Sequence, residues 1–319
     1  MTKHIEDKLD KIPVLNLIAR FFKQIRLPGF EGLSIYDLLE LYVMGIIKGA
    51  LTTRASAIAF SFFTAIFPFL LFVIIVIPEI PIEGFETDFL EFLNSFLPPQ
   101  TSDFFFGYIF EDIQNNTSAE LISTVFVLSV FLMANGVNAV FSGFESSYHR
   151  QVYRNVFKQY MFALGIALIL AFILILSVAV FGYVQIYVIL PLYESFGGKI
   201  GVDPSKELGW IVFAKYLFFV IVIYFATATL YYFGTKEGRH SRFFSVGALL
   251  TTLLIILTSF LFGLYIENFG RYNELYGSVG ALLILLFYLW LNSNILLLGY
   301  ELNASLQFLR KYPKKHHDE

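Results

Sequence analysis

Polar side chains that could bind an ion or a headgroup lie within stretches that are otherwise apolar. The segment WLNSNILLLGYELNASL (residues 290–306) carries Asn292, Asn294, Glu301 and Asn303 among leucines. Polar groups inside a membrane span are costly and usually face protein or a water-filled cavity. The segment is therefore a candidate binding site, although hydrogen bonding between helices would also explain it.

Helical spacing divides these polar residues between two faces of one helix. Asn294 and Glu301 are seven residues apart, so they share a face about 10 Å apart along the axis, and Ser305 continues it. A second stripe on nearly the opposite side consists of Asn292, Gly299 and Asn303. A helix that is polar on two faces should be surrounded by other helices rather than by lipid.

Two further apolar stretches carry polar residues. In one, a stripe at i, i+3, i+7, i+10 and i+14 contains Asn135, Asn138, Ser142, Glu145 and His149, of which we expect Glu145 and His149 to be solvated. The other, RASAIAFSFFTAIFP, begins at Arg54, and its small-residue face contains Ala57, Ser61, Ala65 and Pro68. Small residues allow close helix contact, and serine can hydrogen-bond across it.

These stretches should bring their polar groups to one depth in a helical bundle, where Arg54 could pair with either Glu301 or Glu145. The candidate substrate-binding residues are Arg54, Ser61, Asn135, Asn138, Asn294, Glu301 and Asn303, with Glu145 and Lys215 as secondary candidates. The long stem of Lys215 would also let its ammonium reach the headgroups. The cluster is either a polar cavity open to the cytoplasm or a packed clamp that fixes helix order.

The composition indicates that lipid is part of the solvent. The 319 residues are 57% hydrophobic and only 15% charged, with a mean hydropathy of +0.69, whereas a soluble domain is about 25% charged. There are no cysteines, which excludes disulfides and thiolate chemistry, and only five histidines. We therefore expect no metal, no cofactor and no enzymatic activity.

Six stretches are long and apolar enough to cross a membrane, which takes roughly 20 apolar residues. They lie at about 55–78, 119–141, 160–191, 211–233, 243–266 and 277–303. The alternative, six buried helices in a soluble core, does not fit with so few charges. The sequence therefore predicts an all-α polytopic membrane protein with six transmembrane helices.

The positions of lysine and arginine predict the orientation of these spans, because cytoplasmic loops retain positive charge. Of the 22 such residues, 18 lie in the N-terminal region through Arg54, the second and fourth connections, and the C-terminal tail. The other side has only Lys199, Lys206 and Arg271, with Lys215 just inside the fourth span. Both termini are therefore expected in the cytoplasm.

The connections predict helices at the membrane surface. Residues 34–51 begin with a capping-box-like Ser34 and Asp37 and repeat apolar residues every three or four positions, which favours an interfacial helix. The outer connection 79–118 is acidic, and its phenylalanines recur at helical spacing, which indicates a second amphipathic helix. Its acidity could attract cations or follow simply from its outer position.

One membrane domain accounts for most of the chain. We assign residues 34–308 to this domain, between a basic cytoplasmic segment at 1–33 and a basic cytoplasmic tail at 309–319.

Four segments resemble the YihY/BrkB family of bacterial inner-membrane proteins: RASAIAFSFFTAIFPFLLF (54–72), NAVFSGFESSYHR (138–150), RFFSVGALLTTLLIILTSFLFGLYI (242–266) and YGSVGALLILLFYLWLNSNILLLGYELNASL (276–306). The resemblance covers about residues 35–308, and RASAIAFS, YGSVGA and GYELNA are its most specific parts. Glu301 matches the family pattern, whereas Asn292 and Asn294 depart from it. The resemblance implies six spans, both termini inside and a role in envelope physiology, with lipid or ion transport.

Relatives in that family were once labelled a transfer-RNA-processing ribonuclease (ribonuclease BN). The sequence speaks against a nuclease because it has neither a His/Asp metal cluster nor a broad basic surface. We expect no nucleic-acid partner.

The leading hypothesis is a transporter or lipid-handling protein of the bacterial inner membrane, with a cavity among the first, second and last spans. Its partners would be membrane lipids. The alternatives are a non-transporting scaffold for envelope assembly, joined to envelope proteins or to further copies of itself, and a proton-coupled cation antiporter. In the last case Glu301 would be the coupling carboxylate.

Overall fold

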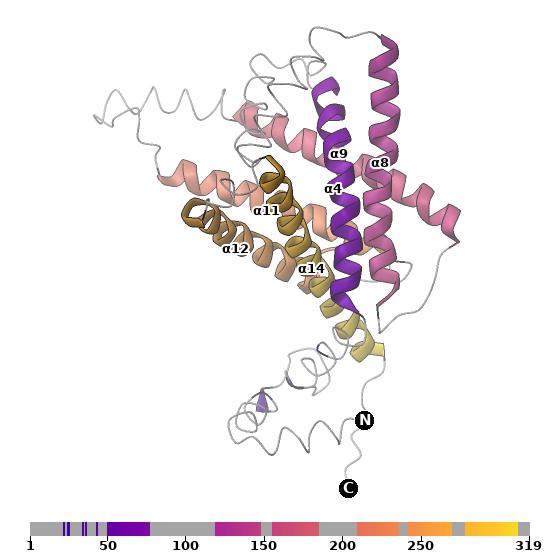
Figure 1. The fold of residues 1–319 in the computed structure, drawn as a ribbon. Coiled ribbons are helices and arrows are strands. Elements are labelled where there is room, and N and C mark those ends of the chain that lie inside the picture. The colour runs from indigo at the N-terminus through magenta and orange to yellow at the C-terminus, as the bar shows by residue number, and fades with distance from the viewer. Residues whose placement is uncertain are drawn as a thin grey trace, which may run out of the picture.

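Six long α-helices make up most of the described part of the chain. The computed structural model describes residues 50–76, 119–147, 155–184, 209–235, 242–269 and 278–311, with a few single positions between 22 and 43. The helices are α4 (Leu51–Val76), α8 (Ala119–Glu145), α9 (Val156–Val184), α11 (Gly209–Gly234), α12 (Val246–Phe269) and α14 (Ser278–Lys311) (Figure 1). Each contains a stretch long and apolar enough to cross a membrane. Within the described residues, this confirms the prediction of an α-helical chain with six helices that could span a membrane.

Each predicted span overlaps one of these helices. The predicted N-terminal segment (1–33), the interfacial helix (34–51) and the acidic outer connection (79–118) lie outside the described residues, apart from single positions and Ala50 and Leu51. The tail is described only as far as Lys311, where α14 ends.

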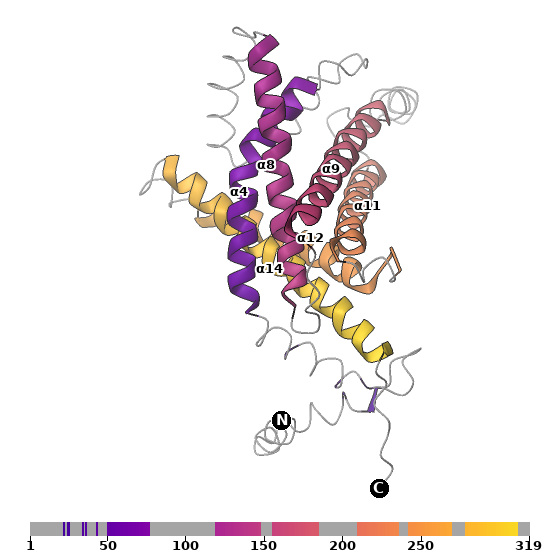
Figure 2. The same ribbon diagram turned by 90° about the vertical axis from the view of Figure 1, so that its right-hand side faces the viewer.

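The helices form a ring in which neighbours in sequence pack side by side. Along the chain, α4 packs on α8, α8 on α9, α9 on α11, α11 on α12 and α12 on α14, and α14 closes the ring against α4. Figure 2 shows the helices drawn together at one end and spread apart at the other, with α14 crossing obliquely. The convergent end holds the first turns of α4, α9 and α12 and the last turns of α8 and α11.

Aromatic side chains fill the centre of the ring near its convergent end. Phe144 stacks on Tyr300, with ring centroids 4.2 Å apart, and Tyr231 meets both rings edge-on. Gly234 lies against this cluster, because a Cβ there would be 2.5 Å from Cδ2 of Phe144. The aromatic cluster therefore packs closely where α8, α11 and α14 meet.

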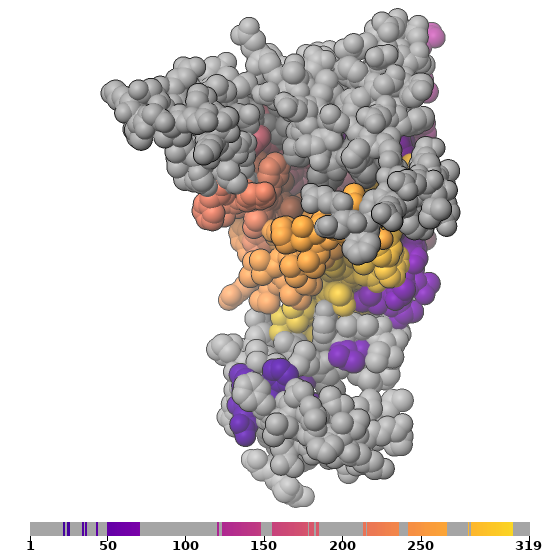
Figure 3. Space-filling model, turned by 60° about the vertical axis from the view of Figure 1, so that its left-hand side comes forward, coloured from indigo at the N-terminus to yellow at the C-terminus, as the bar shows by residue number. Residues whose placement is uncertain are grey.

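The outer surfaces of the helices are apolar. On α12 the exposed side chains include Leu253, Leu257 and Phe260, which are 52–64% exposed, and this helix forms much of the described surface in Figure 3. An apolar surface of this size would be a liability in water. It fits a bundle surrounded by lipid.

Candidate functional site

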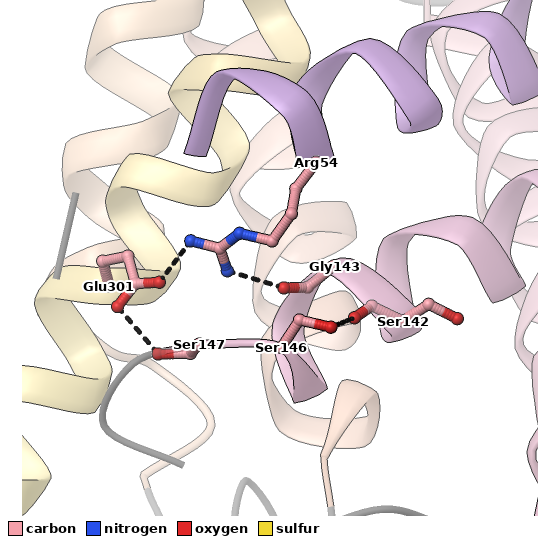
Figure 4. Close-up of polar contacts among 6 residues, drawn as sticks. All are labelled: Arg54, Ser142, Gly143, Ser146, Ser147 and Glu301. Atoms are coloured by element: carbon pink, nitrogen blue, oxygen red, sulfur yellow. Dashed lines mark hydrogen bonds and ion pairs between the residues drawn. The ribbon is translucent and has the colours of Figure 1, made fainter. Parts of the chain in front are cut away.

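A buried ion pair joins the first and last helices at the convergent end. Nη2 of Arg54, in the first turn of α4, lies 2.8 Å from Oε1 of Glu301 on α14 (Figure 4). Glu301 is fully buried, and the Arg54 side chain is only 9% exposed. Of the two pairings expected for Arg54, the structure contains the one with Glu301.

Arg54 also caps the end of α8. Its Nη1 donates to the carbonyl oxygen of Gly143 at 2.7 Å, one of the last four carbonyls of a helix that have no partner within it. A positive charge at this point also offsets the negative end of the helix dipole. One guanidinium thus holds α4, α8 and α14 together.

A serine completes the coordination of Glu301. Ser147, just past the end of α8, donates from Oγ to Oε2 of Glu301 at 2.8 Å and is itself buried (Figure 4). The neighbouring Ser146 instead bonds its own helix at the Ser142 carbonyl. Each carboxylate oxygen of Glu301 therefore has a partner, while the buried Nε of Arg54 has no hydrogen bond. In this conformation the cluster is a packed polar clamp.

The opposite face of α14 caps a different helix. Oδ1 of Asn303 accepts from the Gly247 amide at 2.8 Å, and its Nδ2 donates to Oγ of Ser245 at 2.8 Å. Ser245 accepts in turn from the amide of Ala248 at 3.2 Å. The first amides of a helix have no partner within it, so Asn303 and Ser245 supply partners for the start of α12.

This contact depends on glycine in both helices. A Cβ at Gly299 would overlap Oγ1 of Thr251 and lie 2.6 Å from the hydroxyl of Tyr231. A Cβ at Gly247 would overlap the Gly299 carbonyl. The expectation that α14 is polar on two faces and surrounded by helices therefore agrees with the structure: Glu301 faces α4 and α8, and Asn303 faces α12.

Tyr231 adds a hydrogen bond that the sequence did not indicate. Its hydroxyl donates to the Leu296 carbonyl at 2.7 Å and shares a hydrogen bond with Thr251. The contacts of Gly143 and Ser147 were likewise not expected. Nothing in a single tyrosine, glycine or serine identifies such a role, because it arises only when three helices meet.

Asn292 and Asn294 do not join the clamp. Each donates from Nδ2 to the carbonyl four residues earlier in α14, those of Tyr288 and Trp290, at 2.9 and 2.7 Å. Polar side chains within spans commonly satisfy themselves in this way. Their hydrogen bonds are therefore local to α14.

The residues of the polar stripe predicted on α8 differ in burial, and the structure does not bring the whole stripe to the clamp. Asn135 and Ser142 are exposed, Asn138 is half-buried and Glu145 is buried at 4% exposure, so Glu145 is not solvated as expected. The physical reason is that Ala134, Val137, Phe141 and Phe144 turn toward the centre of the bundle, which places Asn135 on the opposite side.

Other predicted residues lie apart from the clamp. Ser61 is half-buried on α4, and on its predicted small-residue face Ala65 is buried while Ala57 is exposed. Lys215 lies in α11, but its side chain is outside the described residues, as is all of His149.

Comparison with known proteins identifies relatives along nearly the whole chain. The model of the family described as virulence factor BrkB matches residues 45–319. The ribonuclease-like protein YfkH of Bacillus subtilis is 22% identical over 265 residues, covering 82% of this chain and 92% of the relative. UPF0761 membrane proteins of Aggregatibacter aphrophilus and Coxiella burnetii are 26% and 25% identical, covering 82% and 88% of this chain and 89% and 94% of their own lengths. No solved structure matches.

Proposed function

This chain belongs to the virulence factor BrkB family, and we propose that it transports or handles a phospholipid-like or ionic substrate in the bacterial inner membrane. The observation that carries the proposal is the Arg54–Glu301 pair, whose two charges are buried within a membrane bundle. Removing two charges from solvent is expensive, and an apolar contact of similar volume is often as stable. Ionisable residues within spans generally mark substrate or ion pathways.

The pair supports a mechanism based on exchange at Arg54. The guanidinium of Arg54 is held by one carboxylate oxygen and one carbonyl. A phosphate headgroup offers the same acceptor geometry and binds arginine well. An anionic headgroup that displaces Glu301 would therefore release α14 from α4 and α8, and the convergent end would open around the bound headgroup.

A translocation assay tests this proposal. Purified protein is placed in liposomes containing fluorescent phosphatidylglycerol, and a membrane-impermeant reductant measures how fast the label crosses between leaflets. Arg54→Gln removes the group that would bind the headgroup, and Glu301→Gln removes the carboxylate that would take Arg54 back when the headgroup leaves. We expect each variant to lower the rate at least about tenfold, the loss of roughly 1.4 kcal/mol or more at the rate-limiting step. Asn294→Ala is the matched control on the same helix, because Asn294 bonds only its own backbone.

Each outcome of this assay bears on the proposal. A wild-type rate equal to that of empty liposomes excludes phospholipid translocation, and equal rates for wild type and Glu301→Gln exclude the site. The same liposomes with a trapped pH-sensitive dye and a sodium or potassium gradient test the antiporter. If the chain is a cation antiporter, the wild type should exchange cations for protons, and Glu301→Gln should abolish that exchange.

A non-transporting scaffold is the second candidate, and one observation favours it. Both oxygens of Glu301 are already occupied within the chain, as expected of a clamp that only fixes helix order. The scaffold predicts no flux of either kind from the wild type. It also predicts that Arg54→Met/Glu301→Leu keeps its function in cells.

We also propose that the chain is not an enzyme. One relative is called ribonuclease-like, so a direct assay is warranted. Incubation of the purified protein with precursor transfer RNA and divalent metal ions should release no mature product, and cleavage that persists at high purity would overturn this proposal.

A further inference from the structure

An exposed asparagine lies at mid-membrane depth on the outside of the bundle. Asn135 is exposed on α8, twelve residues after the start of the candidate span Ser123–Glu145 and ten before its end. At about 1.5 Å per residue it sits roughly 15–18 Å from either end, close to the middle of a bilayer core about 30 Å thick. Among the described residues its side chain has no hydrogen-bond partner.

Asn135 belongs to a seam with a heptad spacing. Residues 128, 135 and 142 are seven apart, and residues 131 and 138 lie three after the first two. We call this set the α8 seam: Leu128, Phe131, Asn135, Asn138 and Ser142. Leu128 is 52% and Phe131 56% exposed, Asn135 and Ser142 are exposed, and Asn138 is half-buried. In Figure 2 α8 lies at the front, between α4 and α9.

Such a spacing is that of the contact line between two supercoiled helices. A heptad seam keeps one line of side chains facing a partner helix, and an asparagine at an inward-facing position of such a seam fixes register and oligomeric state. In lipid, where apolar residues give no hydrophobic drive to associate, interhelical hydrogen bonds from asparagine contribute more directly. The seam thus combines packing side chains with a central polar contact.

We propose that the α8 seam is the contact surface for a second copy of this chain, with Asn135 paired to Asn135. Two copies inserted in the same orientation place their α8 helices parallel about a twofold axis along the membrane normal. In a parallel pair each residue meets its counterpart. An asparagine can donate from Nδ2 and accept at Oδ1, so two copies of Asn135 satisfy each other, as an isologous contact requires.

The side chains that flank the seam come from α9. Tyr160 donates to the Phe131 carbonyl at 2.9 Å, and its ring lies 5.3 Å from that of Phe131. Gln159 donates to Oγ of Ser142 at 3.0 Å. Two seam residues, Phe131 and Ser142, are therefore already bonded by α9, which lies along one edge of the seam. Asn135 stays exposed beside that edge. The central amide therefore remains available to the partner copy.

Single-cysteine crosslinking tests the proposal, because the chain has no cysteine of its own. Full-length Asn135→Cys in membranes, treated with a mild oxidant, should give a dimer band. The control is Leu257→Cys, a mid-helix residue of α12 that is 52% exposed. A dimer yield no greater than that of Leu257→Cys would overturn the proposal, as would crosslinking only to a different protein.

The strength of association provides a second measurement. In liposomes of varied protein density, subunit counting by photobleaching should show wild-type dimers, and Asn135→Leu should associate about 3- to 30-fold more weakly. If Asn135 merely faces lipid, both proteins will be monomers, and Asn135→Leu will be the more heat-stable. Neither result depends on transport, so the seam and the proposed function can fail separately.

Discussion

At the scale of single residues, the partner of a polar side chain determines its role more than its type or depth does. Glu301 and Asn294 lie on one helix face, two turns apart, yet Glu301 binds residues from α4 and α8 while Asn294 binds its own backbone. Asn135 lies opposite the core-facing side of its own helix. Glu301 thus belongs to the clamp, Asn294 bonds its own helix, and Asn135 is exposed on the outside of the bundle.

Removing one member of the buried ion pair should cost more than removing both. Glu301→Leu leaves the charge of Arg54 buried beside only the Gly143 carbonyl, and we expect it to lower the free energy of unfolding by about 3–5 kcal/mol. Arg54→Met/Glu301→Leu removes both charges and should recover at least half of that loss. Thermal unfolding of the purified variants in one detergent gives the comparison. Equal unfolding temperatures for the single and double variants would contradict this prediction, because they would show that the unpaired charge of Arg54 has no cost.

The sequence predicted part of this site, and the physical reason for each success differs. The candidates Arg54 and Glu301 were evident because a charge within an apolar stretch is costly wherever its helix points. The choice of Glu301 over Glu145 was not, since it depends on how α8 and α14 are rotated toward α4. Gly143 lies in the last turn of α8, and Ser147 lies just past its end. Their contacts with Arg54 and Glu301 depend on where α8 ends, which the sequence did not indicate.

At the scale of helices, the pair α12–α14 is defined by the close approach of Gly247 and Gly299. The approach brings Asn303 onto the amide of Gly247 and Tyr231 onto the carbonyl of Leu296. Helices in lipid associate through such close packing and hydrogen bonds rather than through a hydrophobic drive. This pair therefore positions α14, and with it Glu301.

Replacing two glycines by alanine should separate the cost of overpacking from the gain in helix propensity. Gly299→Ala places a methyl group onto Thr251, and we expect a loss of about 1–3 kcal/mol from overpacking. Gly263→Ala, on the outer part of α12 with open space around it, should be neutral or stabilise by up to about 1 kcal/mol. Thermal unfolding of both variants in the same detergent measures the contrast. A Gly299→Ala variant as stable as Gly263→Ala would mean that α12 and α14 can move apart freely.

At the scale of the whole molecule, six helices were predictable because apolar length is a property of the chain alone. Their ring order and convergence were not, since they follow from side-chain packing between segments far apart in sequence, such as α4 and α14. The outward direction of Asn135 also belongs to this scale. It is set by the rotation of α8 among its neighbours α4, α9, α11 and α14.

The distribution of charge predicts that the convergent end, and with it the Arg54–Glu301 pair, faces the cytoplasm. Of the 22 lysines and arginines, 18 lie in segments predicted to be on the same side as Arg54 and the α11–α12 connection, and positive charge is retained on the cytoplasmic side. Single cysteines can be introduced without background, since the chain has none. In intact spheroplasts an impermeant maleimide should label Ser102→Cys but label Ser241→Cys and Lys314→Cys only after lysis. The reverse pattern would place the pair at the periplasmic end, where a headgroup from the outer leaflet rather than the inner would compete for Arg54.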